Sequence, residues 1–165
     1  MALSTDHRPS APQRVHAALS AAGVATRIEE FPSSTRTAQE AADAVGTSVG
    51  QIVKSLVFLG GGVPILALVS GANRLDPSRL GALTGLEIGK ADADAVRRAT
   101  GYSIGGVPPT GFPAPIPTFV DRDLLQYDVV WAAAGTPRHV FKISLTELVR
   151  VTGGVVADLK HAPSP

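Results

Sequence analysis

The feature of this sequence that most constrains its fold is the apolar run from Ile52 to Ser70, which a group of glycines divides into two halves. The halves, IVKSLVFL and VPILALVS, are each long enough for a buried strand. The glycines at 60–62 can form a tight turn between antiparallel strands. We therefore expect a strand hairpin at the centre of the core, and a chain of 165 residues is long enough to bury one such core.

Helix signals lie on both sides of this hairpin. Capping residues of the Ser, Thr or Asp type precede the predicted helices, and glycines follow them. The predicted helices span 11–22, 38–45, 77–85, 92–101 and 144–152, and further strands are expected at 25–31, 116–120, 129–134 and 140–143. Because strands occur both in hairpins and singly, we expect one α/β domain of the α+β type, with a mixed sheet surrounded by helices.

The domain is expected to span residues 11–159, between a disordered leader at 1–10 and a disordered tail at 160–165. No segment has the apolar length of a signal peptide core or a membrane span. The chain has no cysteine, which excludes disulfides and thiolate catalysis. We expect a cytoplasmic protein with no membrane partner.

Charge and ligand spacing exclude further classes. A formal net charge of +1 gives no broad basic surface, so we expect no DNA binding through the phosphates. The four histidines have no metal-ligand spacing, and no Walker or Rossmann glycine motif is present. We expect no metal and no cofactor. Among the histidines, only His139, at the start of a predicted strand, is a site candidate. The alternative is that it is an ordinary residue at the edge of the strand.

The segment Gly101 to Gly105 matches the G-x-S-x-G pattern of serine hydrolases, with Ser103 at the nucleophile position. Asp121 or Asp128 and then His139 follow it in the order of an α/β-hydrolase triad. A nucleophile elbow needs a strand before the serine and a helix after it, whereas here a charged helix precedes and a proline-rich loop follows. A serine esterase is therefore the less favoured alternative.

Two other features are compatible with a binding site. The loop Gly105 to Pro109 combines glycines, which adopt unusual backbone angles, with rings that stiffen the chain, and its alternative is a plain surface turn. Lys54 lies within a strand predicted to be buried. It is either a lysine with a packed stem and a solvated ammonium, or a cation that faces a cleft.

Several motifs in one order resemble the YbaK family of aminoacyl-tRNA deacylases, which is related to the editing domain inserted in bacterial prolyl-tRNA synthetases. The motifs are TAQEAADAVGTSVGQIVKSLVFL, ALVSGANRLD, TGYSIGGVPPTG and WAAAGTPRHVFKISLTELVRVTGGVVADL. The resemblance covers about residues 12–159. It implies a single domain with a mixed sheet.

The resemblance also implies site residues. Lys54 falls on the family's lysine, and Gly105 to Pro109 falls on the G-x-x-x-P loop that holds the terminal adenosine and the aminoacyl group. The catalytic candidates are thus Lys54, Gly105, Gly106 and Val107, and the substrate-binding candidates are Pro109, Ser70, Gly71, Ala133, Ala134, Gly135 and His139. Some members have serine and glycine where Ala133 and Ala134 stand, which argues here against specificity for cysteine.

The function that follows from the resemblance is trans-editing. We expect the chain to hydrolyse the ester of a mischarged tRNA, in the first place tRNA for proline that carries a small amino acid. Backbone groups, Lys54 and the substrate's own 2′-hydroxyl with water would do the chemistry. The expected partners are the acceptor end of the tRNA and prolyl-tRNA synthetase. The main alternative is a non-catalytic module of the same fold that binds a small ligand or a synthetase.

Overall fold

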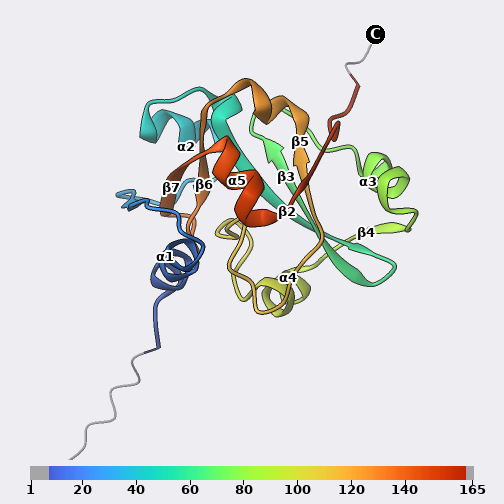
Figure 1. Cartoon of the computed structure of the whole chain (residues 1–165), viewed down its shortest axis with the longest axis horizontal. Helices are drawn as coiled ribbons and strands as arrows, with labels where there is room; N and C mark the ends of the chain where they lie inside the picture. Colours follow the sequence, from blue (N-terminus) through green and yellow to red (C-terminus); the bar gives the residue numbers. More distant parts are fainter. Residues whose placement is uncertain (1–7, 163–165) are drawn as a thin grey trace, which may run out of the picture.

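The computed structural model describes residues 8–162, which form one mixed sheet with helices on both faces (Figure 1). The helices are α1 (Ala11–Ala21), α2 (Ala38–Val45), α3 (Pro77–Thr84), α4 (Ala93–Thr100) and α5 (Leu145–Thr152), with short 3-10 helices η1 (Val49–Gln51) and η2 (Arg122–Gln126). The strands are β1 (Ile28–Glu30), β2 (Ile52–Gly60), β3 (Val63–Ser70), β4 (Ile88–Lys90), β5 (Thr118–Asp121), β6 (Val129–Ala133), β7 (His139–Ser144) and β8 (Val155–Ala157).

The sheet has the strand order β1-β7-β6-β2-β3-β5-β8, and β4 pairs with the far end of β2. The β2–β3 hairpin lies at its centre, with Gly61 and Gly62 at positive φ in the turn, as the sequence predicts. Its neighbours β6 and β5 run parallel to β2 and β3 respectively, whereas β1–β7, β6–β7 and β2–β4 are antiparallel. The predicted mixed sheet in a single α/β domain is confirmed.

The two faces of the sheet bury separate apolar clusters, because successive strand residues point to opposite sides. Val53 of β2 packs with α1, α4 and α5 on one face. Ile52 packs with α2 on the other face, where Leu56 and Phe58 lie against α3 and its surroundings. In Figure 1 the helices lie around the central hairpin.

The helix boundaries follow the predicted caps. Thr37, Asp76, Asp92 and Ser144 each accept a backbone N–H at a helix start, and α2, α3, α4 and α5 each end at a glycine with positive φ. Ser10, assigned by sequence to the leader, caps α1 and forms a capping box with Gln13. The rest of the predicted leader, residues 1–7, lies outside the described residues.

The structure differs from the sequence prediction mainly in short edge elements. The three-residue strands β4 and β8 were not predicted, because they are too short to show an alternating pattern and are held by pairing with β2 and β5. The strand expected at 116–120 begins two residues later. Lys160 and His161, assigned to the tail, hydrogen-bond or pair with Leu75 and Arg74, while 163–165 lie outside the described residues.

Over residues 8–162, no helix has the length and apolar character needed to cross a membrane. The same residues contain no cluster of three or more histidine or carboxylate side chains that could hold a metal ion.

Candidate active site

The candidate site lies where the sheet opens between β2 and β6. These strands pair only through Ile52 with Trp131 and Val53 with Ala132, and β4 does not reach β2 before Phe58. The carbonyl oxygen of Ile52 accepts a hydrogen bond from the Gly71 N–H on the side of β3. Successive strand residues direct their N–H and C=O groups to alternate edges. Those of Val53 and of every second residue after it therefore point to the opposite edge. The stretch of β2 between these pairings thus presents an open edge to a cavity.

The cavity has a volume of about 290 Å³. Four parts of the chain line it: the segment that enters α2, the open edge of β2, the loop after α4, and the end of β6 with the turn into β7. The lining residues are Thr35, Arg36, Thr37, Ala38, Ala41, Ile52, Val53, Lys54, Ser55, Leu56, Ile104, Gly105, Val107, Trp131, Ala132, Ala133, Thr136, Pro137, His139 and Val140.

Lys54 lies within strand β2, and its cationic side chain lines this cavity. Its side chain is half-buried, and its ammonium donates a hydrogen bond to the main-chain carbonyl oxygen of Asn73. Burial lowers the pKa of Lys54 below its usual value, and the negative charge of Asp121 opposes this effect. The ammonium thus has an acceptor within the protein and is partly shielded from water.

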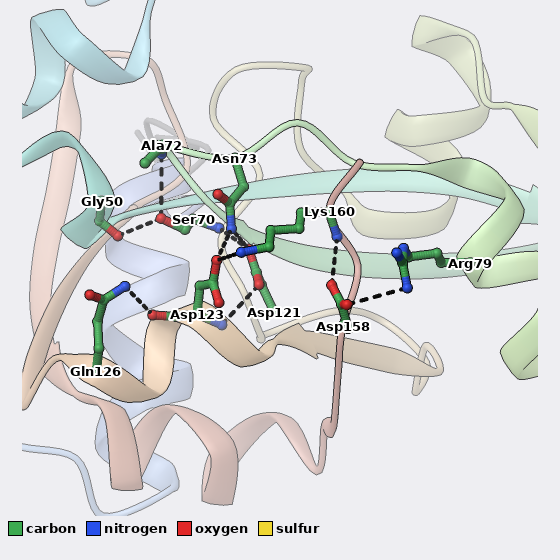
Figure 2. A network of polar contacts seen from close by, with 10 residues as sticks. All are labelled: Gly50, Ser70, Ala72, Asn73, Arg79, Asp121, Asp123, Gln126, Asp158 and Lys160. Atoms are coloured by element: carbon green, nitrogen blue, oxygen red, sulfur yellow. Dashed lines mark hydrogen bonds and ion pairs between the residues drawn. The ribbon is translucent and has the colours of Figure 1, made fainter. Parts of the chain in front are cut away.

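A polar network fixes the segment that receives Lys54 (Figure 2). Asp121 at the end of β5 is only 1% exposed, and its carboxylate accepts from the Ser70 N–H, the Asn73 side-chain amide and the Asp123 N–H. The amide of Asn73 also donates to Asp123, which pairs with Lys160 at 2.8 Å. Hydrogen bonds from Lys160 and then Asn73 lower the pKa of Asp123.

The glycine loop after α4 approaches the β6–β7 turn very closely. A Cβ on Gly106 would lie 2.6 Å from the carbonyl oxygen of Gly135 and 2.6 Å from the Cα of Thr136, so a side chain has no room there. The two segments are joined by a 2.9 Å hydrogen bond from the Gly135 N–H to the Gly106 carbonyl. Gly105 has φ of +90°, a conformation that favours glycine.

The N–H groups of this loop are not equivalent. Gly106 donates its N–H to the Ser103 carbonyl at 3.0 Å, so this group, predicted as a donor to substrate, is already used within the turn. Among the described residues, the N–H groups of Gly105 and Val107 have no intramolecular acceptor. Both residues line the cavity, as does Ile104, whose N–H also has no acceptor within residues 8–162.

The other predicted residues of the β6–β7 turn lie in or directly behind the cavity wall. Ala133 and His139 line the cavity, whereas Ala134 and Gly135 are buried behind it. The His139 ring contacts Thr136 Oγ1 through Nδ1 at 2.5 Å and lies 3.8 Å from Glu30 through Nε2. These contacts orient the ring at the cavity edge.

Besides Ala134 and Gly135, three more predicted binding residues do not line the cavity. Ser70 is buried, and its hydroxyl donates to the Gly50 carbonyl. Gly71 packs so tightly that a Cβ would overlap the carbonyl oxygen of Val49. Pro109 is buried beside a different hollow, near Phe112. Their positions indicate support of the surrounding backbone, and a direct contact with substrate at any of them stays a prediction.

Ser103 is not in a nucleophile elbow. No strand precedes it, since α4 ends at Thr100, and a turn rather than a helix follows. Its exposed hydroxyl accepts from the Arg97 guanidinium at 2.7 Å. His139 makes its contacts with Thr136 and Glu30 instead, so the triad order in the sequence does not produce a triad in space.

Sequence reasoning missed several groups. Asn73 and Asp121 support Lys54 from a loop and a strand distant in sequence, and Ser55 has a buried hydroxyl without a partner in the described chain. Trp131 and Thr136 line the cavity. The one sequence signal for these supporting residues was Asp121 itself, a charged side chain directly after the apolar strand TFV.

Comparison with known proteins identifies the class. The model of the aminoacyl-tRNA editing domain family matches residues 32–151, which is most of the chain and contains Lys54 and the glycine loop. The chain belongs to this family, and the resemblance seen in the sequence is confirmed.

Particular relatives agree with this assignment. A solved structure described as that of a candidate trans-editing enzyme for prolyl-tRNA synthetase is 49% identical, with a TM-score of 0.90, over 94% of this chain and 99% of that one. A scaffold protein used for computational epitope grafting is 50% identical, with a TM-score of 0.89, over 92% of this chain and 98% of that one.

Curated relatives include the uncharacterised protein YwhH of Bacillus subtilis, which is 29% identical over 73% of this chain and 78% of its own length. The proline–tRNA ligase of Elusimicrobium minutum is 31% identical over 79% of this chain, but only 23% of the ligase is covered. The similarity to the ligase is thus confined to less than a quarter of that enzyme.

Proposed function

We propose that this chain hydrolyses the ester bond of mischarged tRNA, with tRNA for proline carrying a small amino acid as the first candidate. The observation that supports this most is that one cavity is lined by Lys54 and by Gly105 and Val107, whose N–H groups have no acceptor in the described part of the chain. A cation and fixed N–H donors at one site suit an ester, whose carbonyl oxygen gains negative charge as water adds.

The proposed roles follow from these positions. The N–H groups of Gly105 and Val107 donate to the ester carbonyl and stabilise the oxyanion, and Lys54 holds the terminal phosphate or ribose. Water adds to the ester carbon, the bond to the 3′-oxygen breaks, and the adjacent 2′-hydroxyl helps to transfer the proton to the leaving oxygen. The products are the free amino acid and uncharged tRNA, and no protein nucleophile is required.

The cavity size supports a small occupant. A volume of about 290 Å³ is at the lower end of ligand pockets, so it suits an aminoacyl group with part of its ribose. The apolar side chains of Trp131 and Val140 and the methyl group of Ala133 line it. Alanine, serine, cysteine and small non-protein amino acids are the candidates.

In this proposal the chain contacts only the acceptor end of the tRNA. The net charge of the chain is only +1, yet Arg36 and Lys54 both line the cavity. A few phosphate contacts at the acceptor end give modest affinity with a shallow salt dependence. Prolyl-tRNA synthetase is a proposed second partner, and charged tRNA as substrate implies a cytoplasmic site of action.

A deacylation panel tests the proposal. Transfer RNA for proline is charged in turn with alanine, serine, cysteine or proline, and ester loss is followed with wild type, Lys54→Ala and the surface control Lys90→Ala. We expect hydrolysis of at least one mischarged form by wild type and Lys90→Ala, and a loss of about 10²-fold in Lys54→Ala. Binding of the mischarged tRNA without hydrolysis of any form would instead identify a non-catalytic module.

A further inference from the structure

The ammonium of Lys54 is received by a main-chain carbonyl rather than by a carboxylate. That carbonyl belongs to Asn73, in the turn that follows β3. A carbonyl oxygen can hold a lysine in place only if its own peptide is fixed. The question is therefore what fixes the turn from Ser70 to Asn73.

Asp121 contacts both ends of this turn, beside hydrogen bonds from the Ser70 hydroxyl to the Gly50 carbonyl and from the Gly71 N–H to the Ile52 carbonyl. One of its oxygens accepts from the Ser70 N–H at 3.0 Å and from the Asn73 amide at 2.8 Å, which are the two ends of the turn. The turn closes on itself through a 2.9 Å bond from the Asn73 N–H to the Ser70 carbonyl. Figure 2 shows the Asp121 carboxylate directed at both residues.

Within residues 8–162, no cation lies within hydrogen-bonding distance of the buried carboxylate. Its two oxygens accept from N–H groups of Ser70, Asn73 and Asp123, while the nearby Lys160 pairs with Asp123. Burial of an unpaired charge is costly unless it is offset by hydrogen bonds and a favourable charge nearby. Lys54 and Lys160 both interact electrostatically with Asp121, and of the two only Lys54 lines the cavity.

We propose that Asp121 is the positioning residue for Lys54: it fixes the Ser70–Asn73 turn, so that the Asn73 carbonyl holds the ammonium at the cavity, and its charge keeps that lysine protonated. This inference rests on the proposed role of Lys54 in the deacylation. It adds Asn73 and Asp121 to the machinery, although neither lines the cavity.

The expected consequence has a definite sign. Burial already lowers the pKa of Lys54, and Asp121 is the group that raises it. Asp123 of η2, Lys160 beyond β8, and Arg36 and His139 on the other cavity walls are the remaining charged or titratable groups around this position. Removing the Asp121 charge therefore lowers the pKa of Lys54 further, and the protonated form is lost at a lower pH.

The test measures Lys54 directly in the full chain without substrate. The chain has four lysines, so a protein labelled with ¹³C-lysine gives four ε-methylene signals, and Lys54→Arg assigns the signal of Lys54. The titration midpoint of Lys54 is compared in wild type, Asp121→Asn and Asp158→Asn. Asp158 is a matched control, because it lies in the same polar region but pairs with Arg79.

We expect the Lys54 midpoint to fall in Asp121→Asn by at least about one pH unit, a tenfold change in its protonation equilibrium, and to stay unchanged in Asp158→Asn. If Asp121→Asn does not fold, Asn73→Ala serves, because it removes the amide contact with Asp121 and loosens the turn while the Asp121 charge stays. In that variant we expect the ε-methylene group of Lys54 to become more mobile, measured by ¹³C relaxation. An unchanged midpoint in folded Asp121→Asn, or unchanged mobility in folded Asn73→Ala, overturns the proposal.

A second readout joins the inference to catalysis. In Asp121→Asn, the alkaline limb of the pH profile of kcat/KM for deacylation should move to lower pH by the same amount as the titration midpoint of Lys54. If the midpoint moves but wild type hydrolyses no charged tRNA, the positioning role of Asp121 stands and the proposed function fails. If wild type is active and the midpoint does not move, the function stands and the positioning role fails.

Discussion

The two walls of the cavity are built in different ways. The glycine wall, formed by residues 104–107 against the 135–137 turn, uses main-chain geometry: close approach at Gly106 and free N–H groups at Gly105 and Val107. The lysine wall, formed by Lys54, Asn73 and Asp121, uses a side chain anchored by a buried polar network. Adding atoms to the glycine wall should disrupt its backbone geometry. Removing charges or hydrogen-bond donors from the lysine wall should release the Lys54 side chain.

This difference explains why the two walls need different variants to test them. An alanine substitution in the glycine wall adds a methyl group where backbone atoms already lie. The same substitution in the lysine wall removes a cation, while most of the cavity keeps its shape. The following predictions separate the two kinds of wall, from the largest effect to the smallest.

The largest effect is expected for Gly106→Ala. The new Cβ would overlap the Gly135 carbonyl and the Thr136 backbone, so the loop must move. The N–H groups of Gly105 and Val107 would then no longer point at the ester carbonyl. We expect deacylation to fall by about 10²-fold or more, as for loss of a preorganised donor, measured under single-turnover conditions. Gly89→Ala is the matched control, since its Cβ would come no nearer than 3.9 Å to Leu59. Equal activity in the two variants would contradict the glycine wall.

A smaller effect, mainly on stability, is expected for Gly71→Ala. Its Cβ would overlap the Val49 carbonyl and press on Ala38 and Ile52, behind the lysine wall. Overpacking of this kind costs about 1–3 kcal/mol, which urea unfolding measures. Because Gly71 belongs to the turn whose Asn73 carbonyl holds Lys54, deacylation by the folded fraction should also fall, but by less than in Gly106→Ala. A large loss of turnover at unchanged stability would instead assign Gly71 a direct role in binding.

The smallest effect is expected for Ser103→Ala, next to the glycine wall. The change removes only an exposed hydroxyl that accepts from Arg97. Surface substitutions of this type shift stability by less than about 0.5 kcal/mol, and we expect the deacylation rate to stay within about twofold of wild type. Loss of activity with the fold retained would revive the serine esterase.

The sequence predicted the fold well because its signals are local. The glycine-divided apolar run, the capping residues before the helices and the terminal glycines each act within a few residues. The short strands β4 and β8 were missed because pairing with longer strands stabilises them, and such pairing leaves no pattern in three residues.

The site was predicted less evenly. Lys54 and Gly105 were found as a lysine in an apolar strand and a glycine in a shaped loop, and both line the cavity. That Gly106 uses its own N–H inside the turn depends on backbone angles that residue types alone do not fix. Asn73 and Asp121 are brought to Lys54 by the parallel pairing of β3 with β5, which only the topology reveals.

The central claim is that the protein positions the ester, while the substrate's own hydroxyl and water react. The most direct test is the single-turnover rate of wild type on mischarged tRNA that ends in 2′-deoxyadenosine, compared with the normal tRNA charged at the same 3′-oxygen. We predict a rate lower by about 10²-fold or more, because assisted proton transfer is lost. An unchanged rate would contradict the account.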